Sequence, residues 1–364
     1  MKRLIQKHLF NNLIKNGKVN PIKNDYINEF IIGKNTFYEV KNYFELINYH
    51  EKLNKILENV KLNNASVAFR KNYSYFNLFD PHKKNYNFLR LDICSFFYSI
   101  NVEDIKEIFK PYVDETQYID EKKEQSILDA FINTITYTIP EDSINKKFSG
   151  KQVLPMGFKT SPIISNIIFR KLDIQIQKLC LENNIVYTRY ADDMLFSSQK
   201  YSKFVHSDIF IERIKVILYQ LKFKLNNHKT IKAKHTLSLN GYIIQYSKYE
   251  KASIFSTENK INEIRLSNKK IHIIKKLIHH LERGDNSWDI LKKLFRFKIK
   301  YEIFPAHTSL KVYYDKQLIR IVIGYRAYLL SIIKFNKRYK CTTNETIKNY
   351  SYLIDKLDSF ISEE

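Results

Sequence analysis

The sequence predicts an α+β fold in which an antiparallel sheet is combined with amphipathic helices. Three observations indicate it. The run IVYTRYADDMLFSS (residues 185–198) places two apolar, β-branched segments around a short polar tip, a pattern typical of a β-hairpin. Residues 43–60 and 205–221 carry apolar side chains at helical spacing. The last third of the chain has the pattern of basic amphipathic helices, for example over residues 261–281.

A basic and aromatic stretch, residues 65–77, follows the first predicted helix at 43–60. Arg70 and Lys71 lie in it beside Phe69, Tyr73 and Tyr75. Either the stretch contacts a nucleotide or a template, or it is an ordinary solvated strand with one buried face, and the sequence leaves both interpretations open.

Residues 88–93 predict a buried strand with Asp92 near its carboxyl end. A lone carboxylate in an apolar strand is costly unless it has a partner or a metal ion. The alternative is an aspartate that caps or turns the chain before the next predicted helix, residues 101–110.

Residues 111–150 are predicted to be helical and acidic at first and to end in a polar loop at Gly150. The turn LPMG (residues 154–157) contains Gly157, which would let the backbone approach a ligand closely. A capped helix with Pro162 in its first turn is predicted from Ser161 to about Glu182.

The segments after the hairpin are shorter. The helix at 205–221 precedes KFKLNNHK (residues 222–229), which predicts a strand running into a polar turn. The segment LSLNGYII (residues 237–244) predicts a pair of short strands broken at Gly241.

The tip of the 185–198 hairpin carries Asp192 and Asp193, and no Lys or Arg occurs from Ala191 to Ser198. Two adjacent like charges repel, and the cost rises near a buried sheet. A divalent cation would remove that cost, and Mg²⁺ prefers one or two carboxylates together with phosphates. The alternative is a solvated Asp-Asp turn, but the hairpin pattern and the third carboxylate at Asp92 count against it.

The charge balance indicates a polyanionic partner. The 364 residues include 61 Lys and Arg against 38 Asp and Glu, a net charge of +23, and residues 260–340 alone hold 20 basic and 6 acidic side chains. A globular protein this basic commonly binds nucleic acid, although compositional drift toward lysine is an alternative. Aromatic residues, 14% of the chain, could stack on single-stranded bases, but most are expected in the core.

The cysteines Cys94, Cys180 and Cys341 are widely spaced and form no zinc-binding pattern. A reduced, intracellular protein is the simple interpretation. The basic start has too short an apolar run for a signal peptide, and no segment approaches the ~20 apolar residues of a membrane span. We therefore expect a cytoplasmic protein without a membrane partner.

The order of these features resembles that of reverse transcriptases. FLRLDICSFF resembles their first palm motif, LPMGFKTSP the motif that contacts primer and nucleotide, YADD the metal-binding hairpin, KLNNHKT the lysine motif and LNGYII the primer grip. The resemblance covers roughly residues 40–250. It implies a right-hand polymerase with an N-terminal segment and fingers (1–88), a palm of antiparallel sheet plus helices (89–250, with a finger insertion at about 111–150), and a helical thumb and C-terminal basic region (251–364).

The resemblance also implies RNA-directed DNA synthesis with two Mg²⁺ ions, for which Mn²⁺ could substitute. Asp92 and Asp192 would bridge the ions, Asp193 would assist, and the carbonyl of Ile93 could add an oxygen. Lys229 would lie near the triphosphate and could act as a general acid, unless it is an ordinary surface lysine. The other implied contacts are to the nucleotide (Arg70, Lys71, Phe97, Met156 and Gly157) and to primer or template (Tyr190, Lys159, Ser161, Asn240 and Gly241).

Two positions bear on nucleotide selection. Phe97, five residues after Asp92, stands where reverse transcriptases carry a bulky aromatic side chain that excludes a ribose 2′-hydroxyl, and it could serve in the core as well. Met156 replaces the glutamine usual in its motif, so a side-chain hydrogen bond to the incoming nucleotide is lost; Met156 could also simply fill a gap in the core.

No RNase H or integrase acid cluster is recognisable, so the chain resembles the compact bacterial enzymes: retron and other defence-associated (abortive-infection-like) reverse transcriptases. Asn77 and His82 resemble a retron motif only with altered spacing, and LNG stands in place of Val-Thr-Gly, which favours a non-retron relative. The group implies a dedicated noncoding RNA template, an RNA/DNA hybrid, deoxynucleoside triphosphates and a role against phage, with an effector protein or a second copy as a further partner.

Three alternatives stay open. The first is a retron enzyme that makes multicopy single-stranded DNA (msDNA). The second is a template-independent or protein-primed DNA polymerase, since tyrosines that could prime are plentiful. The third is a catalytically inactive RNA-binding protein, which would be expected to have lost one of the three acids.

Overall fold

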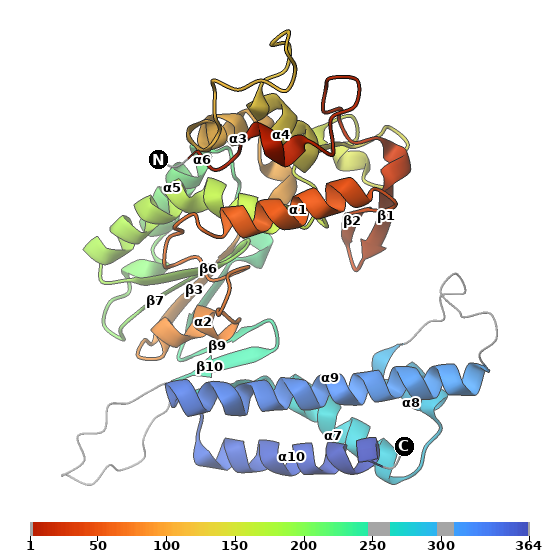
Figure 1. Cartoon of the computed structure of the whole chain (residues 1–364). Helices are drawn as coiled ribbons and strands as arrows, with labels where there is room; N and C mark the ends of the chain where they lie inside the picture. The colour runs from red at the N-terminus through yellow and green to blue at the C-terminus, as the bar shows by residue number, and fades with distance from the viewer. Residues whose placement is uncertain (1–2, 247–262, 297–308, 363–364) are drawn as a thin grey trace. The chain divides into compact units, whose positions relative to one another are not determined.

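The computed structural model describes residues 3–246, 263–296 and 309–362, and the chain divides into two compact units (Figure 1). The first unit comprises residues 1–81 and 87–232, and the second comprises residues 82–86 and 233–364. Helices and antiparallel strands occur together, so the α+β prediction is confirmed. The expected palm–thumb boundary at 250/251 lies outside the described residues.

The sheet of the first unit has the strand order β6-β7-β3-β8. The predicted hairpin is β6 (Val186–Tyr190) and β7 (Asp193–Ser198), and the predicted strand at 88–93 is β3 (Asn87–Asp92), which pairs antiparallel with β7. β8 (Ile231–Lys234) completes the sheet beside β3. The core is continuous under it, because Leu89, Leu91, Met194 and Phe196 are fully buried.

Three predicted helices of the first unit are confirmed with small shifts. They are α1 (Phe44–Leu57), α3 (Val102–Phe109) and α6 (Asp208–Tyr219). α6 begins three residues later than expected because Ser207 is its N-cap, accepting the backbone N–H of Phe210. α5 (Ser161–Glu182) has the predicted bounds and packs against β6 and α6.

The remaining elements of this unit are short. β1 (Ile27–Ile32) and β2 (Asn35–Val40) form a hairpin, and β4 (Tyr137–Thr138) pairs with β5 (Gln152–Val153). The stretch 65–77 is not a strand: it turns, makes one isolated bridge through Ser66, and leads into α2 (Phe76–Phe79).

Two local predictions were wrong in this unit. The acidic residues after 110 are not helical, because the Asp120 carboxylate accepts the backbone N–H groups of Glu124 and Gln125 and folds a turn; the helix α4 (Ile127–Ile135) starts only after its cap at Ser126. Residues 222–229 form no strand. They make one isolated bridge, Leu225 with Ile93, and then a 3₁₀ turn at Asn227–Lys229.

Where the structure describes it, the second unit combines a three-stranded sheet with four helices. The predicted strand pair is confirmed as β9 (Thr236–Leu239) and β10 (Tyr242–Gln245), and β11 (Glu263–Leu266) pairs with β10. The helices are α7 (Asn268–Glu282), α8 (Ser287–Phe295), α9 (Leu310–Tyr339) and α10 (Asn344–Ser362). α9 packs on α8 and α10, and Figure 1 shows α9 and α10 running side by side.

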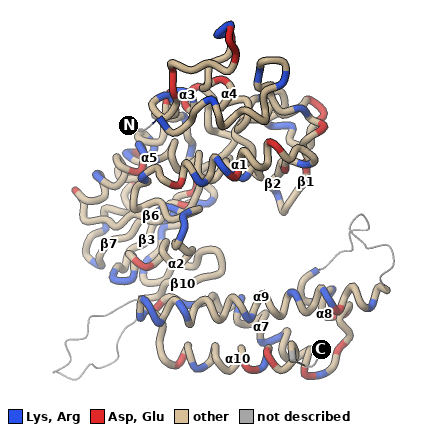
Figure 2. Tube along the Cα trace, in the orientation of Figure 1, with Lys and Arg blue, Asp and Glu red and all other residues tan. Residues whose placement is uncertain are grey.

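The helix expected over 261–281 starts only at Asn268. Residues 263–266 pair in the sheet instead, and the Ser267 hydroxyl accepts the backbone N–H of Lys270 to cap α7. Lys and Arg recur along the helices of this unit, as Figure 2 shows. None of the described helices combines the length and the apolar character that a membrane crossing requires.

Candidate active site

The register of the sheet brings Asp92 and Asp193 face to face. Asp92 ends β3 and lies opposite Asp193, the first residue of β7, while Asp192 occupies the turn between β6 and β7. Asp92 is 2% exposed and Asp193 7%. Burial, and then the charges of Asp193 and Asp92, raise the pKa of Asp192 to about 6.

A buried arginine fixes the backbone of this turn. Arg189 of β6 donates to both carboxylate oxygens of Asp173 on α5 and, at 2.9 Å, to the carbonyl of Ala191. Its remaining donors reach Ser66 Oγ and Asn166 Oδ1. Because Ala191 has a positive φ of 54°, the bond to its carbonyl stabilises the conformation that precedes Asp192.

Asp92 has one paired and one unpaired carboxylate oxygen. Oδ1 accepts a hydrogen bond from Lys229 Nζ at 3.0 Å, and Asn226 N–H donates to the Asp92 carbonyl at 2.8 Å, which fixes the turn that carries Lys229. Oδ2 is buried and has no hydrogen-bond partner in the described part of the chain. A buried carboxylate oxygen left unpaired is costly, so this atom is a fit for a cation.

The Asp193 carboxylate is paired with an arginine. Its Oδ1 accepts hydrogen bonds from Arg90 Nε, at 2.8 Å, and from Arg90 Nη2. Arg90 Nη2 also lies 3.6 Å from Asp92 Oδ1. Within residues 3–246, 263–296 and 309–362, no three His, Cys, Asp or Glu side chains are gathered as a metal-ligand group. Asp92 and Asp192 share a cavity and Arg90 holds Asp193, so the expectation that all three acids bind the metal ions stays a prediction.

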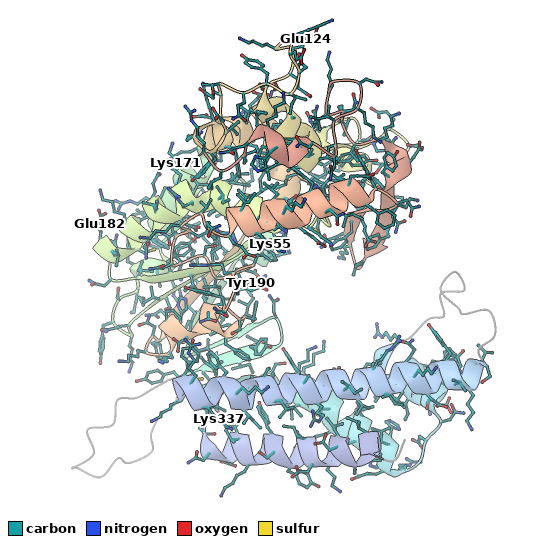
Figure 3. All side chains as sticks on the ribbon, viewed as in Figure 1. Lys55, Glu124, Lys171, Glu182, Tyr190 and Lys337 are labelled. Carbon is teal, nitrogen blue, oxygen red and sulfur yellow. The ribbon has the colours of Figure 1, made fainter. Side chains whose placement is uncertain are left out.

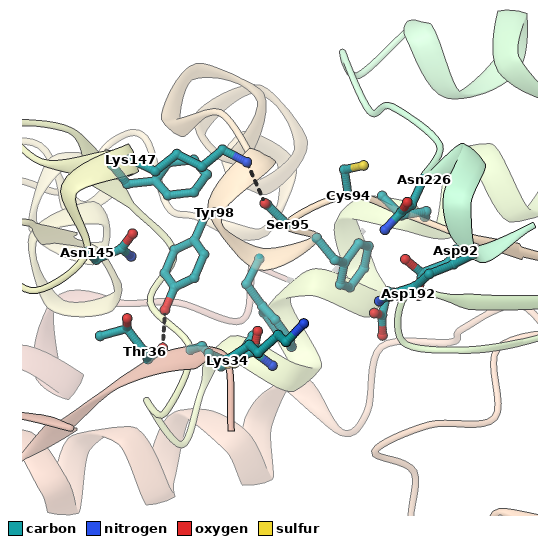
Figure 4. Close-up of a pocket in the computed structure, with 17 residues that line it drawn as sticks. Lys34, Thr36, Asp92, Cys94, Ser95, Tyr98, Asn145, Lys147, Asp192 and Asn226 are labelled. Carbon is teal, nitrogen blue, oxygen red and sulfur yellow. Dashed lines mark hydrogen bonds and ion pairs between the residues drawn. The ribbon is translucent and has the colours of Figure 1, made fainter. Parts of the chain in front are cut away.

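That cavity has a volume of about 250 Å³ and is shown in Figure 4. Asp92, Ile93 and Asp192 line it, and Figure 4 shows the two carboxylates next to each other. Its cationic lining residues are Lys34, Lys147 and Lys229. Lys34 lies in the β1–β2 turn, and Lys147 Nζ donates to Ser95 Oγ at 3.1 Å. Phe97 and Met156 are among the other lining residues.

The donor set fits Mg²⁺. Two carboxylates, one of them with a free buried oxygen, face a cavity with basic side chains at its border, and Mg²⁺ usually takes one or two carboxylates and completes its shell with water and phosphate oxygens. Ile93 also lines the cavity, and the metal contact expected of its backbone carbonyl stays a prediction.

Arg70 and Lys71 lie elsewhere. They line a separate hollow of about 440 Å³ with Tyr73 and Ile163. The Arg70 guanidinium donates to the carbonyls of Asn63 and Ser66 and stacks on the Tyr73 ring, 4.2 Å from its centroid. These bonds hold its own loop, and the nucleotide contact that the resemblance implies for Arg70 and Lys71 stays a prediction.

Gly157 is required by the chain itself. Its φ is +114°, and a Cβ there would lie 2.4 Å from the Tyr38 carbonyl oxygen, so the close approach is to β2. The neighbouring Met156 carbonyl accepts Tyr38 N–H at 2.8 Å. The glycine therefore positions the β1–β2 hairpin, and through it Lys34; its nucleotide contact stays a prediction.

The expected primer and template residues are spread over several places. Lys159 pairs with Glu51 at 2.6 Å, and Ser161 is buried with its Oγ donating to the Pro155 carbonyl. Tyr190, labelled in Figure 3, has its ring 4.8 Å from that of Tyr75. Asn240 and Gly241 form the β9–β10 turn in the second unit, both with positive φ.

Sequence reasoning missed Arg90, Arg189, Asp173, Lys34 and Lys147. For two of them a signal was present, since an arginine inside the apolar strand 186–190 and an aspartate among the apolar residues of α5 indicate a buried ion pair. Lys34 and Lys147 carry no such signal because the other segments that line the cavity are distant from them in sequence.

Comparison with known proteins agrees with this geometry. The model of the reverse transcriptase (RNA-dependent DNA polymerase) family matches residues 46–244, more than half of the chain. The chain therefore belongs to the reverse transcriptase family.

Among curated proteins the chain is similar to two retron enzymes of Escherichia coli. It is 32% identical to the retron Ec73 reverse transcriptase over 171 residues (46% of this chain, 50% of that protein) and 27% identical to the retron Ec83 reverse transcriptase over 206 residues (54% and 62%). The chain thus spans about half the length of the curated relatives it matches. These relatives are of the retron type, so the comparison gives no support to the non-retron preference drawn from Asn77, His82 and LNG.

A solved telomerase from Candida albicans in complex with a fragment of telomeric RNA is a structural neighbour. It has a TM-score of 0.44 and 12% sequence identity, and the match covers 93% of this chain and 63% of that one.

Proposed function

We propose that the chain is an RNA-directed DNA polymerase that extends a primer with deoxynucleoside triphosphates in the cavity between Asp92 and Lys34. The observation that carries the proposal is that a buried carboxylate (Asp92), a half-buried one (Asp192) and three lysines line one cavity in a member of the reverse transcriptase family. In this assignment the first unit supplies fingers and palm, and the helical second unit supplies the thumb.

Asp92 and Asp192 would hold two Mg²⁺ ions, with Asp193 as an auxiliary group. When bound, the ions supply activation of the primer 3′-hydroxyl and stabilisation of the leaving pyrophosphate. Lys229 holds a proton at Nζ beside Asp92 and could deliver it to the pyrophosphate, which makes it the candidate general acid.

Lys34 and Lys147 are assigned to the triphosphate. Both are exposed cations on the cavity that Asp92 and Asp192 line, whereas Arg70 and Lys71 line another hollow. Phosphate oxygens accept strong hydrogen bonds from ammonium groups, so these two lysines suit the charge of the substrate. Phe97 is assigned to the exclusion of the ribose 2′-hydroxyl, since its ring lines the same cavity and is 9% exposed.

The template is assigned by similarity. The matched relatives are retron reverse transcriptases, which favours a dedicated noncoding RNA as template and an RNA/DNA hybrid as product, with msDNA synthesis as the retron form of that activity. The excess of basic residues over 260–340 supports a grip on that hybrid. A role in defence against phage would follow from the same grouping.

The test is primer extension on an RNA template with the purified full chain. Asp192→Asn removes one carboxylate charge from the cavity and should reduce incorporation at least ~10³-fold. Asp208→Asn is the matched control, because Asp208 is exposed and pairs with Lys232, so its activity should stay near wild type.

Three outcomes would contradict the proposal. Full incorporation by Asp192→Asn would remove the metal assignment. DNA synthesis that persists without template, or DNA that stays covalently attached to the protein, would identify a template-independent or protein-primed polymerase. RNA binding without any incorporation would identify an inactive RNA-binding protein.

A further inference from the structure

Arg90 lies among the carboxylates of the candidate site. On β3 it is two residues before Asp92, so both side chains project from the same face of the strand. Asp193, opposite Asp92 on β7, is the diagonal neighbour of Arg90 on that face. The position therefore places a guanidinium within reach of both acids.

The contacts show which acid the guanidinium binds. Arg90 Nε and its second nitrogen both donate to Asp193 Oδ1, whereas the shortest distance to Asp92 Oδ1 is 3.6 Å. The Arg90 side chain is 14% exposed, so solvent screens this pair only in part.

We propose that Arg90 is a built-in counter-cation that occupies Asp193 and thereby sets how tightly the site binds a divalent ion. This inference rests on the metal site of the proposed function. Asp92, with its free Oδ2, and Asp192 are then the primary ligands, while Asp193 is withheld. Arg90 is a positioning residue, because it acts through Asp193.

A fixed positive charge beside two carboxylates repels an incoming divalent cation and neutralises part of the charge that attracts it. Removing that charge while keeping a hydrogen-bond donor should tighten divalent binding and release Asp193. Replacing arginine by lysine keeps the charge, so it should leave the affinity nearly unchanged.

The test is a titration of the full chain with Mn²⁺ alone, followed by the electron paramagnetic resonance signal of free Mn²⁺, which needs no catalysis. We expect Arg90→Gln to lower the dissociation constant at least ~3-fold and Arg90→Lys to stay within ~2-fold of wild type. Lys215→Gln, which removes an exposed charge paired with Glu212 on α6, is the control and should not change binding.

A second comparison keeps the inference testable if Arg90→Gln fails to fold. Asp193→Asn should weaken Mn²⁺ binding much less than Asp192→Asn does, because Asp193 is withheld. Equal losses in these two variants, or unchanged or weaker binding in folded Arg90→Gln, would overturn the inference. Wild-type protein that binds Mn²⁺ with the expected Arg90 effects but makes no DNA would contradict only the proposed function.

Discussion

The Arg189 guanidinium donates to both carboxylate oxygens of Asp173, at 2.9 and 2.8 Å, and neither side chain is exposed to solvent. The pair joins β6 to α5 next to the turn that carries Asp192. Since Arg189 also donates to the Ala191 carbonyl, the ion pair connects the hydrophobic core to the backbone of the candidate site. Coulombic attraction to Asp173 keeps the pKa of Arg189 raised in spite of its burial.

Breaking this pair should destabilise the first unit strongly. Asp173→Asn leaves the Arg189 charge buried and uncompensated, and such changes cost about 3–5 kcal/mol. We expect a loss of that size in the free energy of unfolding, measured by urea denaturation. Glu212→Gln, which breaks an exposed pair with Lys215, should change little, and a similar loss in both variants would contradict the special role of the buried pair.

The nucleotide assignment separates two sets of lysines. Lys34→Ala combined with Lys147→Ala should raise the KM for deoxynucleoside triphosphate at least about tenfold, since even one charge-assisted contact to phosphate contributes about 1.5–3 kcal/mol. Lys71→Ala should leave KM within about twofold, because Lys71 lines the other hollow. Steady-state kinetics on a defined RNA template measures both, and the reverse pattern would place the triphosphate beside Arg70.

Phe97 should control sugar selection. Its ring lines the cavity and contacts Phe96, with ring centroids 5.3 Å apart, so it is held by the core. Phe97→Ala opens space for a 2′-hydroxyl and should reduce discrimination against ribonucleotides at least about tenfold, measured as the ratio of kcat/KM values. Phe97→Tyr keeps the bulk and should keep selectivity. Unchanged selectivity in Phe97→Ala would exclude the steric role.

The sequence could predict the carboxylates because their signal is local. Two apolar segments around Asp192 and Asp193 define a hairpin, and the buried strand predicted over 88–93 has Asp92 near its carboxyl end. Periodicity also located α1, α5 and α6, with errors of a few residues where a capping serine determined the start.

Arg90 and Lys34 could not be assigned in the same way, because their roles depend on pairing between distant segments. The role of Arg90 follows from the β3–β7 register, and that of Lys34 from the seating of the β1–β2 hairpin on Gly157. Neither register nor docking is encoded in a short window of sequence. For the same reason the sequence does not show that the missing side chain of Gly157 accommodates Tyr38.

His50 on α1 gives the fold a defined pH dependence. Its ring is 1% exposed, and its Nε2 lies 2.7 Å from the Thr134 carbonyl oxygen, so this nitrogen donates in the neutral ring. Burial, with Lys159 as a smaller cause, lowers the pKa of His50 to about 4, whereas the unfolded chain has a pKa near 6.5. Between these two values the unfolded chain binds a proton that the folded chain does not bind.

The contribution of neutral His50 to the free energy of unfolding should therefore be fully present above pH 6.5. It should fall as the pH is lowered toward 4, where the loss levels off at about 3 kcal/mol. His50→Gln retains a donor for Thr134 and cannot titrate, so the difference between wild type and variant should shrink by that amount over the same range. Urea unfolding at pH 7.5, 6, 5 and 4 measures it. Burial also lowers the pKa of His82, but His82 is present in both proteins, so its effect cancels in the difference. A difference independent of pH would contradict the neutral buried state of His50.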